Sequence, residues 1–218
     1  YPYLIDDMNY IHLPFSYSYR TLKMPKPKSE TFPTSNIIFN GVLYPEQEVV
    51  KAEALDILNK KKSVILSMYC GFGKTITAIK IASRTKLKVV AIVNKIVLMN
   101  QWVSSVEKFA PGTKVQKLTP KCVPDPDCDF FVINAMNVPK ISTRFWDIIG
   151  VCIVDECHLI MAERLAESLY YIHPRYLIGL SATPYRTDGL DSLLSFYFGK
   201  DKIIRQLNRK HIAYQIET

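Results

Sequence analysis

The sequence predicts an α/β domain built on a mainly parallel β-sheet with helices on both faces. Short runs of Val, Ile and Phe alternate with amphipathic helical segments along most of the 218 residues. The strand-like runs are continuously apolar, which is typical of strands buried on both faces beneath covering helices. Because ligands bind beyond the carboxyl ends of the strands in such sheets, functional residues are expected directly after each strand.

The expected elements alternate regularly from residue 45 onward. The first helix is expected over residues 45–62, with Pro in its first turn and lysines at its end; its apolar face is Val49, Ala52, Leu55 and Leu58. Strands are expected at residues 63–67, 88–93, 129–134, 151–155 and 176–181. Further helices are expected at residues 75–84, 96–109 and 161–172. This alternation predicts βαβ units and therefore parallel strand pairing.

Composition limits the classes of protein to which the chain can belong. A formal net charge of +8 favours a polyanionic partner such as nucleic acid. The longest apolar runs fall far short of the roughly 18–20 residues that a membrane span requires, so no membrane crossing is expected. The first residues lack the features of a secretory signal, and the five cysteines form no CxxC pair. A reducing intracellular compartment, cytoplasm or nucleus, is therefore expected.

The segment MYCGFGKT, residues 68–75, follows the first strand and precedes a helix, as a phosphate-binding loop does. Met68 stands where the leading glycine is usual. Glycines let backbone N–H groups turn inward around phosphate oxygens, Lys74 supplies a cation, and the Thr75 hydroxyl can bind Mg²⁺. The nucleotide-binding residues expected from this loop are Gly71, Phe72, Gly73, Lys74, Thr75 and Ile76. A chance glycine turn is the disfavoured alternative.

A second motif, VCIVDECH, places two carboxylates at the carboxyl end of a buried strand. Asp155 and Glu156 thereby fall on the same sheet edge as the phosphate loop. Paired acids there suit metal-assisted phosphoryl transfer, in which Asp155 holds Mg²⁺ and Glu156 orients and deprotonates the attacking water. The alternative is a solvated acidic turn, and His158 taken alone is more often a structural histidine.

With these motifs in order, and SATP at residues 181–184, the chain resembles the first RecA-like domain of superfamily 2 helicases and translocases. The resemblance covers roughly residues 44–218. The runs CGFGKTIT and VNKIVLMNQW are similar to helicases of large DNA viruses, including the poxvirus transcript-release type. The run SATPYRTDGLD is similar to repair and branch-migrating helicases of phages and cells.

The resemblance implies a role for several residues that spacing alone does not assign. ATP and Mg²⁺ would be the cofactors, with Lys74 and Thr75 on the phosphates and Mg²⁺, Asp155 on Mg²⁺ and Glu156 as catalytic base. Gln47 would read the adenine through its amide, unless it is an ordinary helix-start glutamine. Hydrolysis would be coupled to domain movement by His158, Ser181 and Thr183. The nucleic-acid backbone would be contacted by Asn94, Lys95 and Arg186.

The implied organisation is an N-terminal extension at residues 1–43, an ATP-binding domain at residues 44–200 and a connector at residues 201–218. We expect the Tyr-rich extension to pack onto the domain rather than to stack on bases. The connector would lead to a second RecA-like domain supplying a QxxGRxxR motif, which does not occur in these 218 residues. Without its arginines we expect the chain to hydrolyse ATP barely and to unwind nothing.

The function implied is the ATPase half of an ATP-driven helicase or translocase acting on nucleic acid, with DNA favoured over RNA. A viral member would act in the host cytoplasm and could be carried in the virion. Two alternatives stay open. One is a non-translocating P-loop enzyme such as a small-molecule kinase, and the other is a non-catalytic nucleic-acid-binding module on an ATPase scaffold.

Overall fold

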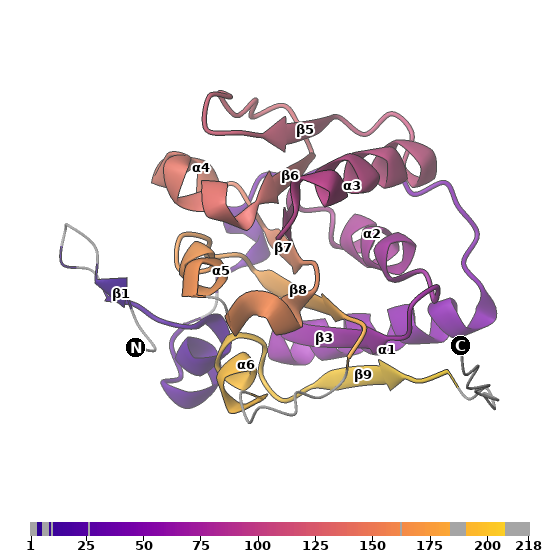
Figure 1. Cartoon of the computed structure of the whole chain (residues 1–218), viewed down its shortest axis with the longest axis horizontal. Helices are drawn as coiled ribbons and strands as arrows, with labels where there is room; N and C mark the ends of the chain where they lie inside the picture. The colour runs from indigo at the N-terminus through magenta and orange to yellow at the C-terminus, as the bar shows by residue number, and fades with distance from the viewer. Residues whose placement is uncertain are drawn as a thin grey trace, which may run out of the picture.

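The centre of the protein is a seven-stranded sheet in which every neighbouring pair is parallel (Figure 1). We describe it from a computed structural model covering residues 4–5, 9, 11–25, 27–161, 163–183 and 191–207. The strand order is β5-β6-β4-β7-β8-β3-β9. The strands are β3 Ser63–Met68, β4 Val89–Val93, β5 Val115–Leu118, β6 Phe130–Asn134, β7 Val151–Val154, β8 Tyr176–Ser181 and β9 Lys202–Arg205. The parallel sheet predicted from the sequence is confirmed.

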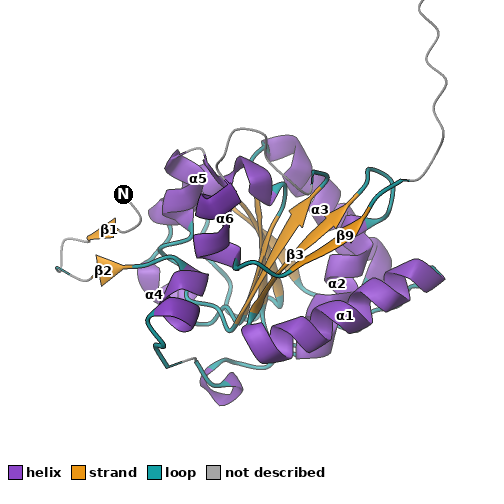
Figure 2. Cartoon of the chain, turned by 90° about the horizontal axis from the view of Figure 1, so that it is seen from below, coloured by secondary structure: helices purple, strands orange, loops and turns teal. Residues whose placement is uncertain are grey.

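Helices cover both faces of this sheet, as Figure 2 shows. One face carries α1 Pro45–Lys61, α2 Lys74–Thr85 and α3 Ile96–Phe109. The other carries α4 Thr143–Trp146, α5 Glu163–Ser168 and α6 Asp191–Phe198, with two 3₁₀ segments, η3 Ala135–Lys140 and η4 Cys157–Met161. None of the helices in the described ranges is long and apolar enough to cross a membrane.

Alternate residues of each central strand point into two separate hydrophobic cores. In β4, Val89 and Ala91 face the core beneath α1 to α3, whereas Val90 and Ile92 face the core beneath α4 to α6. All five residues of this strand are fully buried. A continuously apolar strand is therefore required at the centre of the sheet, because neither of its faces meets water.

The buried face of α1 differs from the expected one. Of the predicted residues Leu58 is buried, but Val49 is 51% exposed, and Leu58 is joined in the core by Gln47, Val50 and Ala54. Both sets have helical spacing, so the apolar pattern alone does not choose between them. On the face that is buried, the Gln47 amide also bonds to the phosphate loop.

The segment expected as one helix over residues 161–172 is shorter in the structure. Helix α5 ends at Ser168, and the chain then turns through Leu169 and Tyr170 with i→i−3 backbone bonds. The Tyr170 hydroxyl bonds to that of Tyr197 at 2.8 Å, which holds the turn against α6. Strand β5 and helices α4 and α6 were not predicted, and residues 202–205 of the expected connector form β9 beside β3.

The N-terminal extension packs onto the domain, as expected. It contains a short antiparallel pair, β1 Leu4–Ile5 with β2 Ile11–His12, a π-helical turn η1 Tyr17–Thr21 and a 3₁₀ turn η2 Ser29–Thr31. Arg20 Nη1 donates to Asp201 Oδ2 at 2.5 Å, and Arg20 Nη2 donates to Ser63 Oγ at 3.2 Å. Further on, Phe32, Ile37 and Leu43 are buried. The domain boundaries after residues 43 and 200 stay predictions.

Candidate nucleotide-binding site

The phosphate loop connects the carboxyl end of β3 to α2 and depends on two glycines with positive φ. Gly71 has φ +87° and Gly73 has φ +92°, a backbone region that L side chains rarely adopt. At Gly73 space is restricted as well, since an added Cβ would lie 2.5 Å from Gln47 Nε2. Between them Phe72 is buried, with its ring edge-on to Tyr69. The loop therefore turns tightly into a helix N-terminus, a favourable position for an anion.

Lys74, Thr75 and Ile76 form the first turn of α2, and all three are half-buried. Lys74 Nζ donates a hydrogen bond to the Met68 carbonyl at 3.0 Å, so the ammonium group lies back across the loop. The cation and the Thr75 hydroxyl thus occur where the loop turns into the helix. Their binding roles stay predictions.

Gln47 joins the start of α1 to the phosphate loop. Its Nε2 donates to the Phe72 carbonyl at 2.6 Å, and its Oε1 accepts the Tyr44 N–H at 2.9 Å. The side chain is only 4% exposed. A carboxamide still has a second N–H and further lone pairs, so the predicted adenine contact is chemically compatible with these bonds.

The Asp155 carboxylate is held in one orientation by two hydrogen bonds. Its backbone N–H donates to Ile92 O at 2.9 Å and extends the β7–β4 pairing by one residue. Oδ1 accepts the Glu156 N–H at 3.1 Å, and Oδ2 accepts the Trp102 indole N–H at 2.9 Å. Trp102 was not among the residues predicted for the site. Its only sequence signal is a tryptophan on the apolar face of a predicted helix.

Glu156 has φ +49°, in the left-handed region, so the chain turns sharply directly after Asp155. Glu156 Oε2 is buried and lacks a hydrogen-bond partner among the described residues; the nearest ion-pair contact is His158 Nδ1 at 3.4 Å. The same His158 nitrogen lies 3.0 Å from Ser181 Oγ. Ser181 Oγ in turn donates to the Thr183 carbonyl at 2.7 Å and accepts the Thr183 N–H at 3.1 Å. The residues predicted to couple hydrolysis to movement therefore form one connected chain.

The sheet order brings the predicted site residues to one edge. Strands β7, β8 and β3 are neighbours, so the acidic turn, Ser181 and the phosphate loop all lie at adjacent carboxyl ends. Asn94 and Lys95 follow β4, the strand beside β7. Lys95 is exposed, whereas the Asn94 amide oxygen is buried without a partner in the part of the chain that the structure describes. Arg186 lies outside the described residues.

The residues at this edge fit a magnesium nucleotide. Two positive-φ glycines and a helix N-terminus suit phosphate, and an oriented carboxylate and a threonine hydroxyl at the same edge of the sheet suit Mg²⁺. Burial, followed by the charges of Glu156 and Asp155, raises the pKa of the Cys157 thiol, which therefore stays protonated beside the site. Within the described ranges, no group of three or more His, Cys, Asp and Glu side chains could hold a metal ion.

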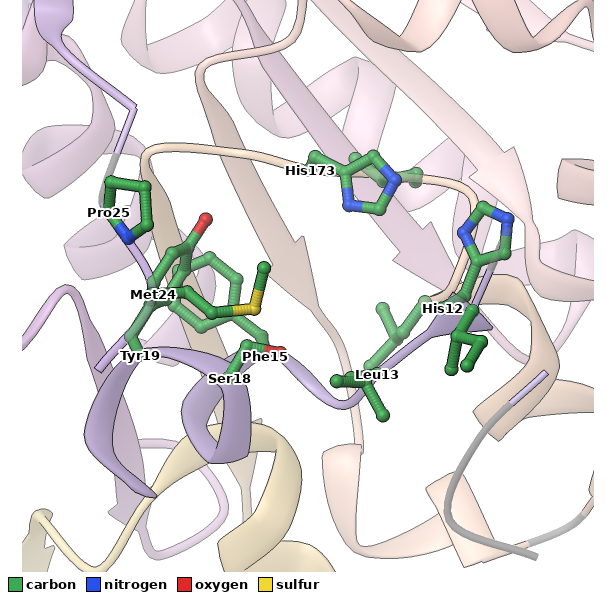
Figure 3. A pocket seen from close by; sticks show the side chains of 11 residues that line it. His12, Leu13, Phe15, Ser18, Tyr19, Met24, Pro25 and His173 are labelled. Atoms are coloured by element: carbon green, nitrogen blue, oxygen red, sulfur yellow. The ribbon is translucent and has the colours of Figure 1, made fainter. Parts of the chain in front are cut away.

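A cavity of about 160 Å³ lies elsewhere, between the N-terminal extension and the segment that leads into the amino end of β8 (Figure 3). Figure 3 shows Phe15, Tyr19 and Met24 on one side of it and the imidazoles of His12 and His173 on the other. The two imidazoles stack with their centroids 5.7 Å apart. Because the phosphate loop lies at the opposite ends of the strands, this cavity is separate from the candidate site.

Comparison with known proteins matches residues 40–186 to the family model described as "Type III restriction enzyme, res subunit". A protein named as a helicase, 161L of Invertebrate iridescent virus 6, is 44% identical over 227 residues, covering 99% of this chain and 49% of the viral protein. The chain therefore spans about half the length of that relative. Transcript termination protein A18 of Yaba monkey tumor virus is 30% identical over 164 residues, covering 67% of this chain and 34% of A18.

Among solved structures, the UvsW helicase from Bacteriophage T4 has a TM-score of 0.66 at 15% sequence identity. The similarity covers 93% of this chain and 82% of UvsW. At this level of identity the similarity shows the fold alone, and it confirms the RecA-like domain expected from the sequence.

Proposed function

Because the chain belongs to the superfamily 2 helicase family matched by the res-subunit model, we propose that it forms the ATP-hydrolysing domain of a nucleic-acid translocase or helicase. The observation that carries this proposal is the edge formed by β7, β8 and β3. There a phosphate loop, an oriented carboxylate and a buried carboxylate oxygen without a hydrogen bond among the described residues occur at the ends of neighbouring strands.

In the proposed mechanism, the loop N–H groups and Lys74 bind the ATP phosphates and position the γ-phosphoryl group. Magnesium, held by Thr75 and Asp155, would neutralise charge that develops on that group. Glu156 accepts a proton from the attacking water through Oε2, which has no competing hydrogen bond among the described residues. Gln47 reads the adenine with the donor and acceptor capacity that its two existing bonds leave.

His158 is the residue through which this site would sense domain movement. It lies 3.4 Å from the proposed base and 3.0 Å from Ser181, and Ser181 is bonded to Thr183. A displacement of the loop after β8 would therefore change the surroundings of Glu156 through two contacts. This arrangement supports the coupling role proposed for all three residues.

Nucleic acid is the proposed binding partner, with DNA favoured over RNA. The proposed contacts are Asn94, Lys95 and Arg186. The net charge of +8 supports binding to phosphates. A second RecA-like domain would supply arginines across the cleft, a contribution of about 10³–10⁵ in turnover in related phosphoryl-transfer enzymes. The family assignment does not favour the small-molecule kinase or the non-catalytic module.

ATP turnover measured with and without single-stranded and duplex DNA and RNA tests this proposal. The protein should carry the proposed second domain, and Lys74→Ala is its inactive control. Stimulation by nucleic acid is expected, with little turnover by residues 1–218 alone. An ATP turnover rate that nucleic acid does not change, together with phosphate transfer to a small acceptor, would indicate a kinase. Nucleic-acid binding without any turnover would indicate a non-catalytic module.

A further inference from the structure

We infer that Trp102 is a positioning residue for the magnesium-binding carboxylate of Asp155. This inference rests on the proposed function and adds to it a residue that the motifs do not identify. The direct observation is the hydrogen bond from the indole Nε1 to Asp155 Oδ2, at 2.9 Å and across 53 residues of sequence.

The indole is itself fixed on all sides. Trp102 is 1% exposed and lies on the buried face of α3 with Met99 and Val106. Its ring stacks on Phe130 of β6, with centroids 6.1 Å apart and planes inclined by 26°. A side chain held in this way can direct its single N–H at only one place, and that place is the Asp155 carboxylate.

The carboxylate therefore has one bond to each oxygen and keeps lone pairs on both. Oδ1 accepts the Glu156 N–H and Oδ2 accepts the Trp102 N–H. Neither donor can turn away, because one is backbone and the other is a packed ring. The remaining lone pairs are thereby aimed in fixed directions, which is the effect that outer hydrogen-bond partners have on metal-binding carboxylates.

Trp146 supplies a matched control. It is the other tryptophan of the sequence, is also 1% exposed and lies in α4 on the opposite face of the sheet. Its indole N–H has no hydrogen-bond partner among the described residues. Phenylalanine at either position removes an indole from a core, but only Trp102→Phe removes a bond to Asp155.

The contact can be tested without metal or nucleotide by the two indole N–H resonances of the ¹⁵N-labelled chain. Asp155→Asn should shift the Trp102 resonance and leave that of Trp146 unchanged, with the two assigned by their loss in Trp102→Phe and Trp146→Phe. If Trp102→Phe does not fold, the Asp155→Asn spectrum still tests the bond, because Trp146→Phe alone assigns both signals. An unmoved Trp102 resonance would overturn the inference.

The positioning role is tested by binding of the fluorescent nucleotide mant-ADP, followed by anisotropy during a Mg²⁺ titration. Trp102→Phe should bind mant-ADP as wild type does in EDTA, but should need about 10- to 100-fold more Mg²⁺ to reach the metal-dependent affinity. Trp146→Phe should follow wild type. Combined with Asp155→Asn, Trp102→Phe should cause no further change.

Two failures are distinguishable in this experiment. If Trp102→Phe and Trp146→Phe show the same Mg²⁺ dependence, the positioning role is wrong although the nucleotide site stands. If wild type itself binds no mant-ADP, and Lys74→Ala makes no difference, the proposed nucleotide site fails and the role of Trp102 fails with it.

Discussion

Replacement of Gly73 by alanine is expected to destabilise the chain more than the same replacement at Gly112. Both glycines have a positive φ, +92° and +84°, so each alanine incurs left-handed strain of about 1–2 kcal/mol. An added Cβ at Gly112 has no atom within 4 Å, whereas at Gly73 it would lie 2.5 Å from Gln47 Nε2. Gln47 must then leave the Phe72 carbonyl, a bond that contributes about 0.5–1.5 kcal/mol.

The expected loss of unfolding free energy is therefore about 1–2 kcal/mol for Gly112→Ala and about 1.5–3.5 kcal/mol for Gly73→Ala. Urea unfolding followed by tryptophan fluorescence measures both, since the two tryptophans are buried. In a Gln47→Ala background the closest obstruction is gone and only the Ile76 Cγ2 contact at 3.1 Å stays, so the excess cost of Gly73→Ala over Gly112→Ala should shrink. Equal losses at the two glycines, or full additivity with Gln47→Ala, would refute the reasoning.

Three further outcomes are expected. Lys74→Ala should lose nucleotide affinity in an equilibrium titration because the loop loses its cation, whereas Lys80→Ala on the same helix should retain that affinity. Equal nucleotide affinities of the two variants would contradict the phosphate-loop assignment. Nucleic-acid affinity should fall steeply with salt and depend little on base sequence, and a salt-insensitive isotherm would argue against phosphate-dominated binding. At pH 7 a thiol reagent should modify the exposed Cys70, and ATP should slow this modification. Cys152 and Cys157, whose thiol pKa values are raised by burial, should react only on unfolding. Mass spectrometry of the modified peptides checks the thiol prediction, which early labelling of Cys152 would contradict.

The parts of the site that could be predicted from the sequence are those whose chemistry is local. A glycine turn between strand and helix, and an acidic pair directly after a buried strand, each lie within eight residues of chain. Their meeting at one edge follows from parallel pairing, which the continuously apolar strands indicate. The adjacency of β7, β8 and β3 then brings Asp155 towards the phosphate loop.

The parts that could not be predicted depend on contacts between distant segments. The buried face of α1 carries the bond from Gln47 to Phe72, a long-range contact, whereas two helical faces were compatible with the apolar spacing. The bond from Trp102 to Asp155 joins α3 to the end of β7, and the spacing of residues in the sequence does not indicate it. Strand β5 was not predicted because it is a short edge strand with only one fully buried residue, Leu118.

The most direct test of the central claim compares Glu156→Gln with wild type for ATP affinity and for single-turnover hydrolysis. The protein should carry the proposed second domain and be saturated with nucleic acid. If Glu156 is the base, the variant should bind magnesium ATP as wild type does and hydrolyse it at least about 10²-fold more slowly. If binding and hydrolysis fall together, Glu156 is a ligand rather than a base; unchanged turnover would contradict the proposed active site.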